Sequence, residues 1–467
     1  MPRVTRVVIV GGGPGGYEAA LVARQLGADV TIVHRDGLGG SAVLTDAVPS
    51  KALIATANVI TAAASSATLG VLIHGLRPDP SLVGVDLTTV NTRIKALAAQ
   101  QSADITARID REGIRRIEGR GRFNGSGHIV ATRADGTDEV LEADVTLLAT
   151  GTRPRSLPEA QPDGERILTW EQVYDLPEVP ERLIVVGSGV TGAEFAGAYH
   201  ALGSRVVLIS SREHVLPSED PDAARVLEGV YAERGLEVLS SSRAVAARRT
   251  DTGVEVTLST GATITGSHVL MAVGSSPNTD DLHLDTVGVD TDSRGFISVD
   301  RVSRTSHRGI YAAGDCTGVL MLASVAAMQG RIAMWHALGD AVTPLEPGLV
   351  SSTVFTDPEI ATVGLTQADL DAGRFRGDVA MVPLAANARA KMSDHTDGFV
   401  KLFCRRGSRI VAGAVVVSPH ASELILPLTI AVEQRLTVDQ LASTFTVYPS
   451  LSGSIAEAAR RLRLAAE

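Results

Sequence analysis

Two glycine-rich segments have the residue types and the spacing that bind the pyrophosphate of a dinucleotide. The first segment follows the apolar run 7–10 and contains the glycines Gly11, Gly13 and Gly16. In such a turn the first glycine allows the tight bend, the second lets the backbone approach the phosphates, and the third lets the helix pack on the strand. The N-terminus of that helix then faces the phosphates. The pattern predicts a β-turn-α-β unit, with a helix to about residue 25 and a strand over 29–33.

The same pattern recurs in the middle of the chain. The apolar run 183–186 precedes the second fingerprint, which contains Gly187, Gly189, Val190 and Gly192. A helix to about residue 202 and a strand over 205–209 are predicted to follow. Two complete fingerprints imply that one chain binds two dinucleotides. The simplest interpretation is a flavin dinucleotide at one site and a nicotinamide dinucleotide at the other, with hydride transfer between them.

The residues that end the second strand of each unit normally contact the adenosine ribose, and an acid there binds its hydroxyls. In the first unit this position is His34, with Asp36 two residues later. Asp36 could reach the ribose instead of the missing acid, or His34 could donate to a hydroxyl. Both alternatives stay open from the sequence.

The second unit has no acid at the matching position and continues as Ser210, Ser211 and Arg212. The two hydroxyls can donate hydrogen bonds, and the guanidinium can pair with a phosphate. The segment therefore predicts recognition of the 2′-phosphate of NADPH, with NADH still tolerated. The alternative is that Arg212 is an ordinary solvated arginine of a turn.

Composition excludes several other classes of protein. The chain has 467 residues, which allows about three domains of typical size. A net charge of −10 argues against nonspecific binding of nucleic acid. We expect no integral membrane segment, no signal segment and no metal site, so the cytoplasm is the expected location. The two cysteines, Cys316 and Cys404, lie too far apart in sequence for a disulfide framework or a zinc site.

Further motifs make the chain resemble the flavoprotein disulfide reductases, the dihydrolipoamide dehydrogenase-like family, over essentially its whole length. Ala149-Thr150-Gly151 follows an apolar strand, and the segment 309–315 ends in Asp315. Gly119-Arg120-Gly121 resembles the segment near the adenine. The segments 355–359 and 363–364 resemble the start of the dimerisation domain.

The resemblance implies an α/β fold with two Rossmann-like dinucleotide-binding domains and a C-terminal α+β dimerisation domain. The FAD domain is expected over 1–153 and 277–345, with an alanine-rich helical stretch over 50–105. The inserted NAD(P)H domain is expected over 154–276, and the dimerisation domain over 346–467. A homodimer is therefore expected.

The resemblance also assigns residues to the cofactors. For FAD it adds Gly39, Gly40, Ser41, Ala42, Lys51, Gly121, Thr150, Gly151, Asp315 and Ala323, and for NAD(P)H it adds Gly274. Asp315 matches the aspartate that accepts hydrogen bonds from the ribityl hydroxyls, although it could instead be only a helix N-cap. Cys316 is expected to be a small buried residue.

Four catalytic groups of the disulfide reductases are absent. The two cysteines that flank four residues in the family's redox motif are replaced by Ala42 and Ala47. A methyl group cannot exchange electrons with a disulfide. The family's histidine–glutamate pair, supplied by the partner subunit, is replaced by Tyr448 and Gly453. Tyrosine, with a reference pKa of about 10, is a poor general base at neutral pH.

Lys51 and Glu194 match the family's lysine, which approaches flavin N5, and the glutamate that pairs with it. With Tyr448 they are the predicted catalytic residues. The chain resembles the NAD(P)H:quinone reductase branch, so we expect an FAD enzyme that reduces quinones or similar acceptors. The alternatives are a soluble pyridine nucleotide transhydrogenase and a catalytically silent flavoprotein that acts as a binding partner. The sequence leaves the physiological acceptor open, and Tyr448 could donate to a quinone oxygen or merely pack.

Overall fold

The computed structural model describes residues 4–78 and 83–464. The chain divides into two compact units, each built from three segments. The first unit combines residues 1–50, 91–155 and 274–347, and the second combines 51–90, 156–273 and 348–467. The finer domain boundaries expected from the sequence stay predictions.

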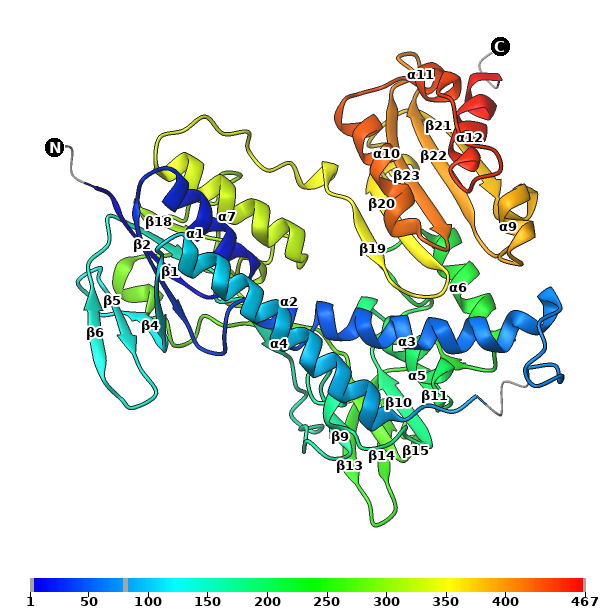
Figure 1. The fold of residues 1–467 in the computed structure, drawn as a ribbon, viewed down its shortest axis with the longest axis horizontal. Coiled ribbons are helices and arrows are strands. Elements are labelled where there is room, and N and C mark those ends of the chain that lie inside the picture. Colours follow the sequence, from blue (N-terminus) through cyan, green and yellow to red (C-terminus); the bar gives the residue numbers. More distant parts are fainter. Residues whose placement is uncertain (1–3, 79–82, 465–467) are drawn as a thin grey trace. The chain divides into compact units, whose positions relative to one another are not determined.

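A five-stranded parallel sheet forms the centre of the first unit (Figure 1). Its strands, in spatial order, are β18 (Ile310–Ala312), β7 (Val145–Leu148), β1 (Arg6–Val10), β2 (Asp29–His34) and β3 (Arg115–Glu118). β1 lies in the middle and is almost entirely buried, as expected for an apolar strand with parallel neighbours on both sides.

Helices cover one face of this sheet and a small antiparallel sheet covers the other. Figure 1 shows α1 (Pro14–Gln25) and α7 (Ala323–Ala337) side by side. The second half of α4 (Leu87–Arg111) packs into the same core. The opposite face contacts β4 (Arg120–Phe123), β5 (Ile129–Thr132) and β6 (Asp138–Leu141). The short helix α2 (Gly40–Leu44) and the paired strands β8 (Thr152–Pro154) and β17 (Ser275–Pro277) complete the unit.

The second unit contains the other parallel sheet. Its strands, in spatial order, are β12 (Glu237–Leu239), β11 (Arg205–Ile209), β10 (Arg182–Val186), β16 (His268–Met271) and β9 (Ile167–Leu168). The helix α5 (Val190–Ala201) connects β10 to β11, and α6 (Pro221–Glu233) connects β11 to β12. The meander β13 (Ala244–Arg249), β14 (Val254–Leu258) and β15 (Thr263–Gly266) packs against this sheet.

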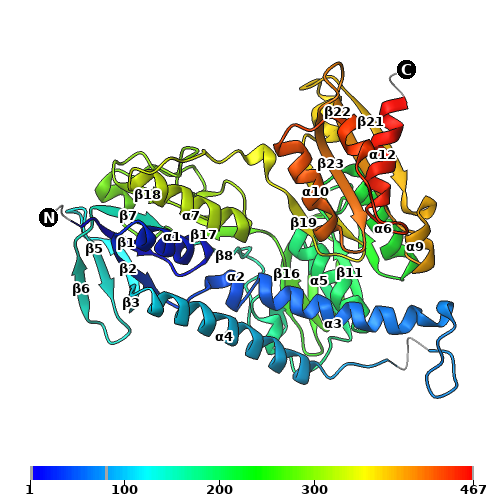
Figure 2. The same ribbon diagram turned by 45° about the horizontal axis from the view of Figure 1, so that its top comes forward.

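The C-terminal part of the second unit is an antiparallel sheet with helices on one face. Its strands, in spatial order, are β19 (Ser352–Val354), β20 (Glu359–Gly364), β23 (Val411–Ser418), β22 (Phe399–Arg405) and β21 (Gly377–Pro383). Figure 2 shows α10 (Ala421–Glu433) and α12 (Gly453–Leu464) on this sheet. The shorter helices are α8 (Gln367–Asp371), α9 (Ala388–Met392) and α11 (Val438–Ser443).

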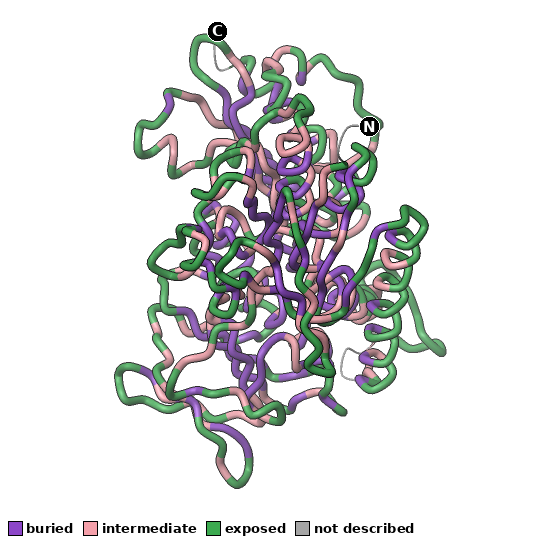
Figure 3. The backbone as a smooth tube through the Cα atoms, turned by 90° about the vertical axis from the view of Figure 1, so that its left-hand side faces the viewer, coloured by how far each residue is buried: buried purple, intermediate pink, exposed green. Residues whose placement is uncertain are grey.

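Burial follows the sheets. Figure 3 shows buried residues in the interior and exposed residues along the outer loops, and the strands of the sheets are mostly buried. The predicted fold class, with two Rossmann-like domains and an α+β dimerisation domain, is confirmed. The stretch expected to be helical over 50–105 is interrupted, because α3 ends at Ser65 and α4 begins at Leu87.

One helical stretch, Gly40–Leu69, has the length and mean hydropathy of a membrane span. The sequence predicts no integral membrane segment, and this single stretch does not overturn that prediction. Length and composition alone are weak evidence for a span. Within the second unit, residues of α3 (Ala47–Ser65) line a cavity together with residues of α5 and of the 355–357 segment, so part of this helix packs against protein.

Candidate active site

The first fingerprint forms an open turn in front of α1. Gly11 has a φ of 119°, and a Cβ built on it would lie 2.0 Å from the carbonyl oxygen of Ala149. A Cβ on Gly16 would lie 1.9 Å from the carbonyl oxygen of Gly11, so only glycine lets the helix approach the turn. Gly13, by contrast, has no atom closer than 4.0 Å to such a Cβ. It is also the N-cap of α1, and no side chain caps that helix. The N-terminus of α1 is therefore open to an anion, which the helix dipole favours at this end.

Several residues predicted for FAD lie around this turn. The Gly39 backbone N donates to the Gly12 carbonyl at 2.8 Å, which places the start of α2 beside the turn. Gly121 of β4 lies against Val10, the last residue of β1. Gly151 follows Thr150 directly and has a φ of 67°. The predicted residues Gly40, Ser41 and Ala42 belong to α2, and Ala323 is the first residue of α7.

Unpartnered polar atoms near the turn test whether the site fits a flavin dinucleotide. Both ring nitrogens of His34 and the Thr150 hydroxyl are buried without a hydrogen-bond partner among the described residues. His34 is 6% exposed, and its burial, with a smaller contribution from Arg116, lowers its pKa. Asp36 forms an ion pair with Arg35 on the surface. Buried polar groups normally have partners, so these atoms fit a site that a polyhydroxylated ligand completes.

Asp315 lies three residues after the end of β18, at the first residue of a short 3₁₀ helix whose N-cap is Gly314. The Thr152 hydroxyl donates to its carboxylate at 3.4 Å. Burial, reinforced by the charge of Asp46, raises the pKa of Asp315 to about 6. A carboxylate in this environment gains from hydroxyl donors, which stabilise its charged form. This fits the predicted contact with the ribityl chain.

The second fingerprint repeats the geometry of the first in the other unit. Gly187 has a φ of 108°, and a Cβ on Gly192 would lie 1.8 Å from the Gly187 carbonyl oxygen. Gly189 is the N-cap of α5, no side chain caps the helix, and no atom lies within 4 Å of a Cβ built on it. Val190, the first residue of α5, is exposed. The turn therefore fits a second pyrophosphate.

The loop after β11 separates the three residues predicted to recognise the adenosine ribose. The hydroxyl of Ser210 is fully buried and accepts hydrogen bonds from the Ser188 hydroxyl at 2.7 Å and the Arg212 backbone N at 3.1 Å. Ser210 thus organises the loop. Ser211 and Arg212 are exposed. Gly274, predicted for NAD(P)H, lies in the first unit with a φ of 100° and open space beside it.

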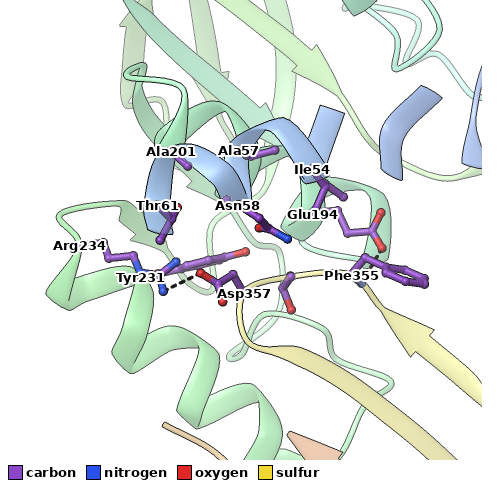
Figure 4. A pocket seen from close by; sticks show the side chains of 13 residues that line it. Ile54, Ala57, Asn58, Thr61, Glu194, Ala201, Tyr231, Arg234, Phe355 and Asp357 are labelled. Atoms are coloured by element: carbon purple, nitrogen blue, oxygen red, sulfur yellow. Dashed lines mark hydrogen bonds and ion pairs between the residues drawn. The ribbon is translucent and has the colours of Figure 1, made fainter. Parts of the chain in front are cut away.

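The structure brings Lys51 and Glu194 together in the second unit. The Lys51 ammonium donates to Glu194 Oε2 at 2.8 Å, and the Glu194 side chain is only 3% exposed. The Phe355 backbone N–H donates to the other oxygen, Oε1, at 2.8 Å. The ammonium also lies 5.1 Å from the centre of the Phe355 ring, within the range of a cation–π contact. Figure 4 shows the carboxylate of Glu194 directed toward Phe355.

A small cavity of about 20 Å³ lies beside this pair, lined by residues from four segments of the second unit. Ile54, Ala57, Asn58 and Thr61 come from α3, and Tyr231 and Arg234 come from α6 and its C-cap. The sequence did not predict the contributions of Tyr231, Arg234 and Asp357. No local pattern predicts contacts between segments that are so far apart in the sequence. The backbone hydrogen bond from Phe355 was missed for the same reason.

Alanines, a tyrosine and a glycine occupy the positions of the four missing catalytic groups. Ala42 lies in α2 and Ala47 begins α3. Tyr448 is 85% exposed, and Gly453 begins α12. Both cysteines are free and buried, and burial raises the pKa of Cys404 and raises that of Cys316 to about 11. Over residues 4–78 and 83–464, no group of three or more histidine, cysteine or acidic side chains could hold a metal.

Known proteins share these features. Residues 5–330 match the pyridine nucleotide-disulphide oxidoreductase family, and residues 350–459 match the dimerisation domain of that family. An NAD(P)H dehydrogenase (quinone) of Mycobacterium tuberculosis is 55% identical over 98% of this chain and 94% of its own length. A dihydrolipoyl dehydrogenase of Haloferax volcanii is 35% identical over 97% of this chain and 95% of its own.

Solved structures agree with this assignment. The crystal structure of LpdA from Mycobacterium tuberculosis superposes with a TM-score of 0.93 at 54% identity, covering 98% of this chain and 100% of that one. The flavoprotein disulfide reductase RclA from Escherichia coli, with a TM-score of 0.85 at 21% identity, shares the fold over 97% of this chain and 99% of its own. The protein is an oxidoreductase that uses FAD and NAD(P)H. The chain belongs to the pyridine nucleotide-disulphide oxidoreductase family.

Proposed function

We propose that this enzyme uses NAD(P)H to reduce quinones or similar planar acceptors through FAD, without a redox disulfide. The observation that carries the proposal is the lack of a reactive thiol. Alanines occupy positions 42 and 47, and the only two cysteines of the chain are buried with raised pKa values. A thiol of this kind is a poor nucleophile, because the thiolate is the reactive form.

The 55% identical relative named NAD(P)H dehydrogenase (quinone) supports the same acceptor class. The dihydrolipoyl dehydrogenases among the relatives are only 31–35% identical. Reduction of a quinone requires two electrons and protons but no sulfur chemistry, so the missing cysteines do not prevent it.

The chain's own residues have defined tasks in the proposal. Bound FAD supplies the two-electron chemistry between the nicotinamide and the acceptor. The uncapped N-termini of α1 and α5 bind the two pyrophosphates. Asp315 and either His34 or Asp36 hold the sugar hydroxyls of FAD. Lys51, oriented by Glu194, stabilises the negative charge that develops on the flavin ring system.

NADPH is the proposed nucleotide, with NADH tolerated. Arg212 and Ser211 are exposed in the loop after β11, where the adenosine ribose of a Rossmann unit lies. Ser210 is neutral, so no carboxylate in this position repels a 2′-phosphate.

We further propose that the enzyme is a homodimer in which Tyr448 of one protomer lines the acceptor pocket of its partner. The match of residues 350–459 to the dimerisation domain supports this arrangement, as does the exposure of Tyr448. Its phenol either donates to a quinone oxygen or packs against the acceptor. The cytoplasmic location expected from the sequence stays a prediction.

Steady-state assays of the purified enzyme test the proposal. With NADPH as donor, we expect turnover with menadione that survives alkylation by iodoacetamide, and negligible turnover with lipoamide or glutathione disulfide. Turnover with either disulfide would overturn it. Faster transfer to thio-NAD than to any quinone would favour the transhydrogenase alternative. A flavin absorption band that NADPH leaves unbleached without oxygen would identify a silent flavoprotein.

A further inference from the structure

The orientation of the Glu194 carboxylate depends on a backbone group far away in sequence. Lys51 uses Oε2, and the Phe355 N–H holds Oε1, so each oxygen has one donor. Because the side chain is nearly fully buried, water cannot replace either bond without cost. The carboxylate therefore faces Lys51 only if the backbone at Phe355 stays in place.

An ion pair fixes that backbone. The Asp357 carboxylate, two residues after Phe355, lies 2.9 Å from the guanidinium of Arg234. Arg234 is the C-cap residue of α6, so the pair ties the Phe355 segment to the end of a helix. Figure 4 shows the Arg234–Asp357 pair and the Glu194–Phe355 bond on the same segment, at opposite ends of the cavity.

The helix that carries Arg234 is itself held firmly. Near its C-terminus, the Tyr231 hydroxyl donates at 2.7 Å to the carbonyl of Ala193, the residue before Glu194. At its N-terminus, the buried Lys401 ammonium of β22 contacts Asp220 at 2.9 Å and Asp222 at 2.8 Å. A buried charge that loses its partner is strongly destabilising, so these contacts keep α6 in one position. α6 is thus a rigid support for the Phe355 segment.

We propose that Arg234 and Asp357 are positioning residues for the Lys51–Glu194 pair. Their ion pair holds the Phe355 N–H against Glu194 Oε1, and the carboxylate in turn aims the Lys51 ammonium. The inference rests on the proposed role of Lys51 in flavin reduction and adds to it the residues that keep the lysine aligned. A misplacement of about 1 Å far from the reacting atoms can cost up to a hundredfold in rate.

Charge-neutral and conservative variants of the holoenzyme test this role. Asp357→Asn and Arg234→Gln remove the ion pair, Arg234→Lys keeps the charge, and Glu194→Gln provides the reference for loss of the carboxylate itself. Asp378→Asn is the matched control, because it breaks the Asp378–Arg406 ion pair, 2.6 Å long, elsewhere in the same unit. The readouts are the rate of flavin reduction by NADPH in anaerobic rapid mixing across pH, the flavin midpoint potential and the unfolding temperature.

We expect Asp357→Asn and Arg234→Gln to slow flavin reduction by about tenfold and to shift its pH profile in the same direction as Glu194→Gln. Because Arg234→Lys keeps the positive charge, it should recover to within about threefold of the parent. Asp378→Asn should match the parent. If Asp357→Asn fails to fold, the positioning role is tested by the rates of flavin reduction in Arg234→Gln and Arg234→Lys.

Two results would overturn the inference in distinguishable ways. If Glu194→Gln changes the pH profile but the Arg234 and Asp357 variants change only the unfolding temperature, the positioning role is wrong and the proposed function stands. If Glu194→Gln itself leaves rate, pH profile and potential unchanged, the role of the Lys51–Glu194 pair is wrong, and the inference falls with it.

Discussion

Lys51 has two kinds of neighbour in the second unit, an anionic carboxylate and the face of an aromatic ring. Both hold the ammonium in a fixed direction. The ammonium is only partly exposed, so its field is less screened than that of a surface lysine. Negative charge develops on the flavin as it is reduced. A fixed cation of this kind stabilises that charge.

Removal of this cation should slow the nucleotide half-reaction. We expect Lys51→Met to reduce the rate of flavin reduction by NADPH by about tenfold to a hundredfold, with little change in the affinity for NADPH. Lys391→Met, on the exposed helix α9, is the matched control and should leave the rate unchanged. Rapid mixing without oxygen measures the rate of flavin reduction in both variants. An unaltered rate in Lys51→Met would show that the Lys51–Glu194 pair has another role.

Asp315 should make FAD binding depend on pH. In the chain without ligand its pKa is raised to about 6, so the carboxyl group is mostly protonated below that pH. Ribityl hydroxyls donate to the charged form, so the affinity of the apoprotein for FAD should rise by about tenfold from about pH 5 to pH 7 and then level off. Fluorescence titration of apoprotein with FAD measures this dependence. Asp315→Asn should bind FAD more weakly with a flat profile, and a pH-dependent Asp315→Asn would assign the titration to another group.

At the scale of elements, the two fingerprint turns determine where α1 and α5 start. In each turn one glycine is required for packing and another borders open space. The packing glycine lets the helix contact the first strand, and the open glycine leaves the helix N-terminus accessible. Stability and nucleotide binding therefore depend on different glycines of the same turn.

This separation can be tested in the second turn. Gly192→Ala places a Cβ 1.8 Å from the Gly187 carbonyl oxygen and should destabilise the fold by about 2 kcal/mol or more. Gly189→Ala meets no atom within 4 Å, and the N-cap has a φ of −70°, which any residue adopts. It should keep the unfolding temperature while weakening NADPH binding by about tenfold, because the Cβ occupies the space left for the pyrophosphate. Thermal unfolding and NADPH titration separate the two effects, and equal loss of stability in both variants would contradict this assignment.

The elements around the fingerprints could be predicted closely from the sequence. The predicted strand 205–209 is β11 as the structure has it, and the helix predicted to about residue 25 is α1. Glycine spacing and apolar runs are local signals, so they fix the start and the type of each element. The break between α3 and α4 was not predicted, because the alanines on either side of it dominated the interpretation of the stretch. Helix-breaking residues do occur between the two helices, namely Gly70, Gly75, Pro78, Pro80 and Gly84.

The contacts that complete the candidate active site were beyond prediction from residue patterns alone. The Lys51–Glu194 pair was expected only because both positions match a known family. The bond from Phe355 to Glu194 joins residues 161 positions apart, and Lys401 and Asp220 are separated by 181 positions. Such contacts depend on how segments that are distant in sequence pack within the second unit, and local spacing carries no information about that packing.

For the whole molecule, the surface of the dimerisation domain carries an apolar segment between α11 and α12. Phe445 is 102% exposed relative to a reference residue, and Val447 is 77% exposed. Exposed large apolar side chains that lie close together mark interaction sites. We expect this segment to be buried against a second copy of the chain, next to the proposed partner contribution of Tyr448.

A charge placed in this segment should weaken the dimer. Phe445→Lys is expected to raise the dimer dissociation constant by at least about tenfold, because it removes an aromatic anchor and buries an unpaired ammonium. Val140→Lys on β6 in the first unit, also an exposed apolar position, is the matched control. Light scattering over a dilution series measures the dimer dissociation constant of both variants. A Phe445→Lys variant that stays as dimeric as Val140→Lys would place the interface elsewhere.

The most direct test of the central claim separates the two half-reactions in time. The holoenzyme is first reduced by one equivalent of NADPH without oxygen, and the flavin absorbance is then followed after mixing with menadione, lipoamide or glutathione disulfide. If electrons pass from the flavin without sulfur, the oxidised flavin band should return rapidly with menadione and should not return with either disulfide. Treatment with iodoacetamide should change neither result. Return of that band with a disulfide, or its failure to return with menadione, would contradict the account.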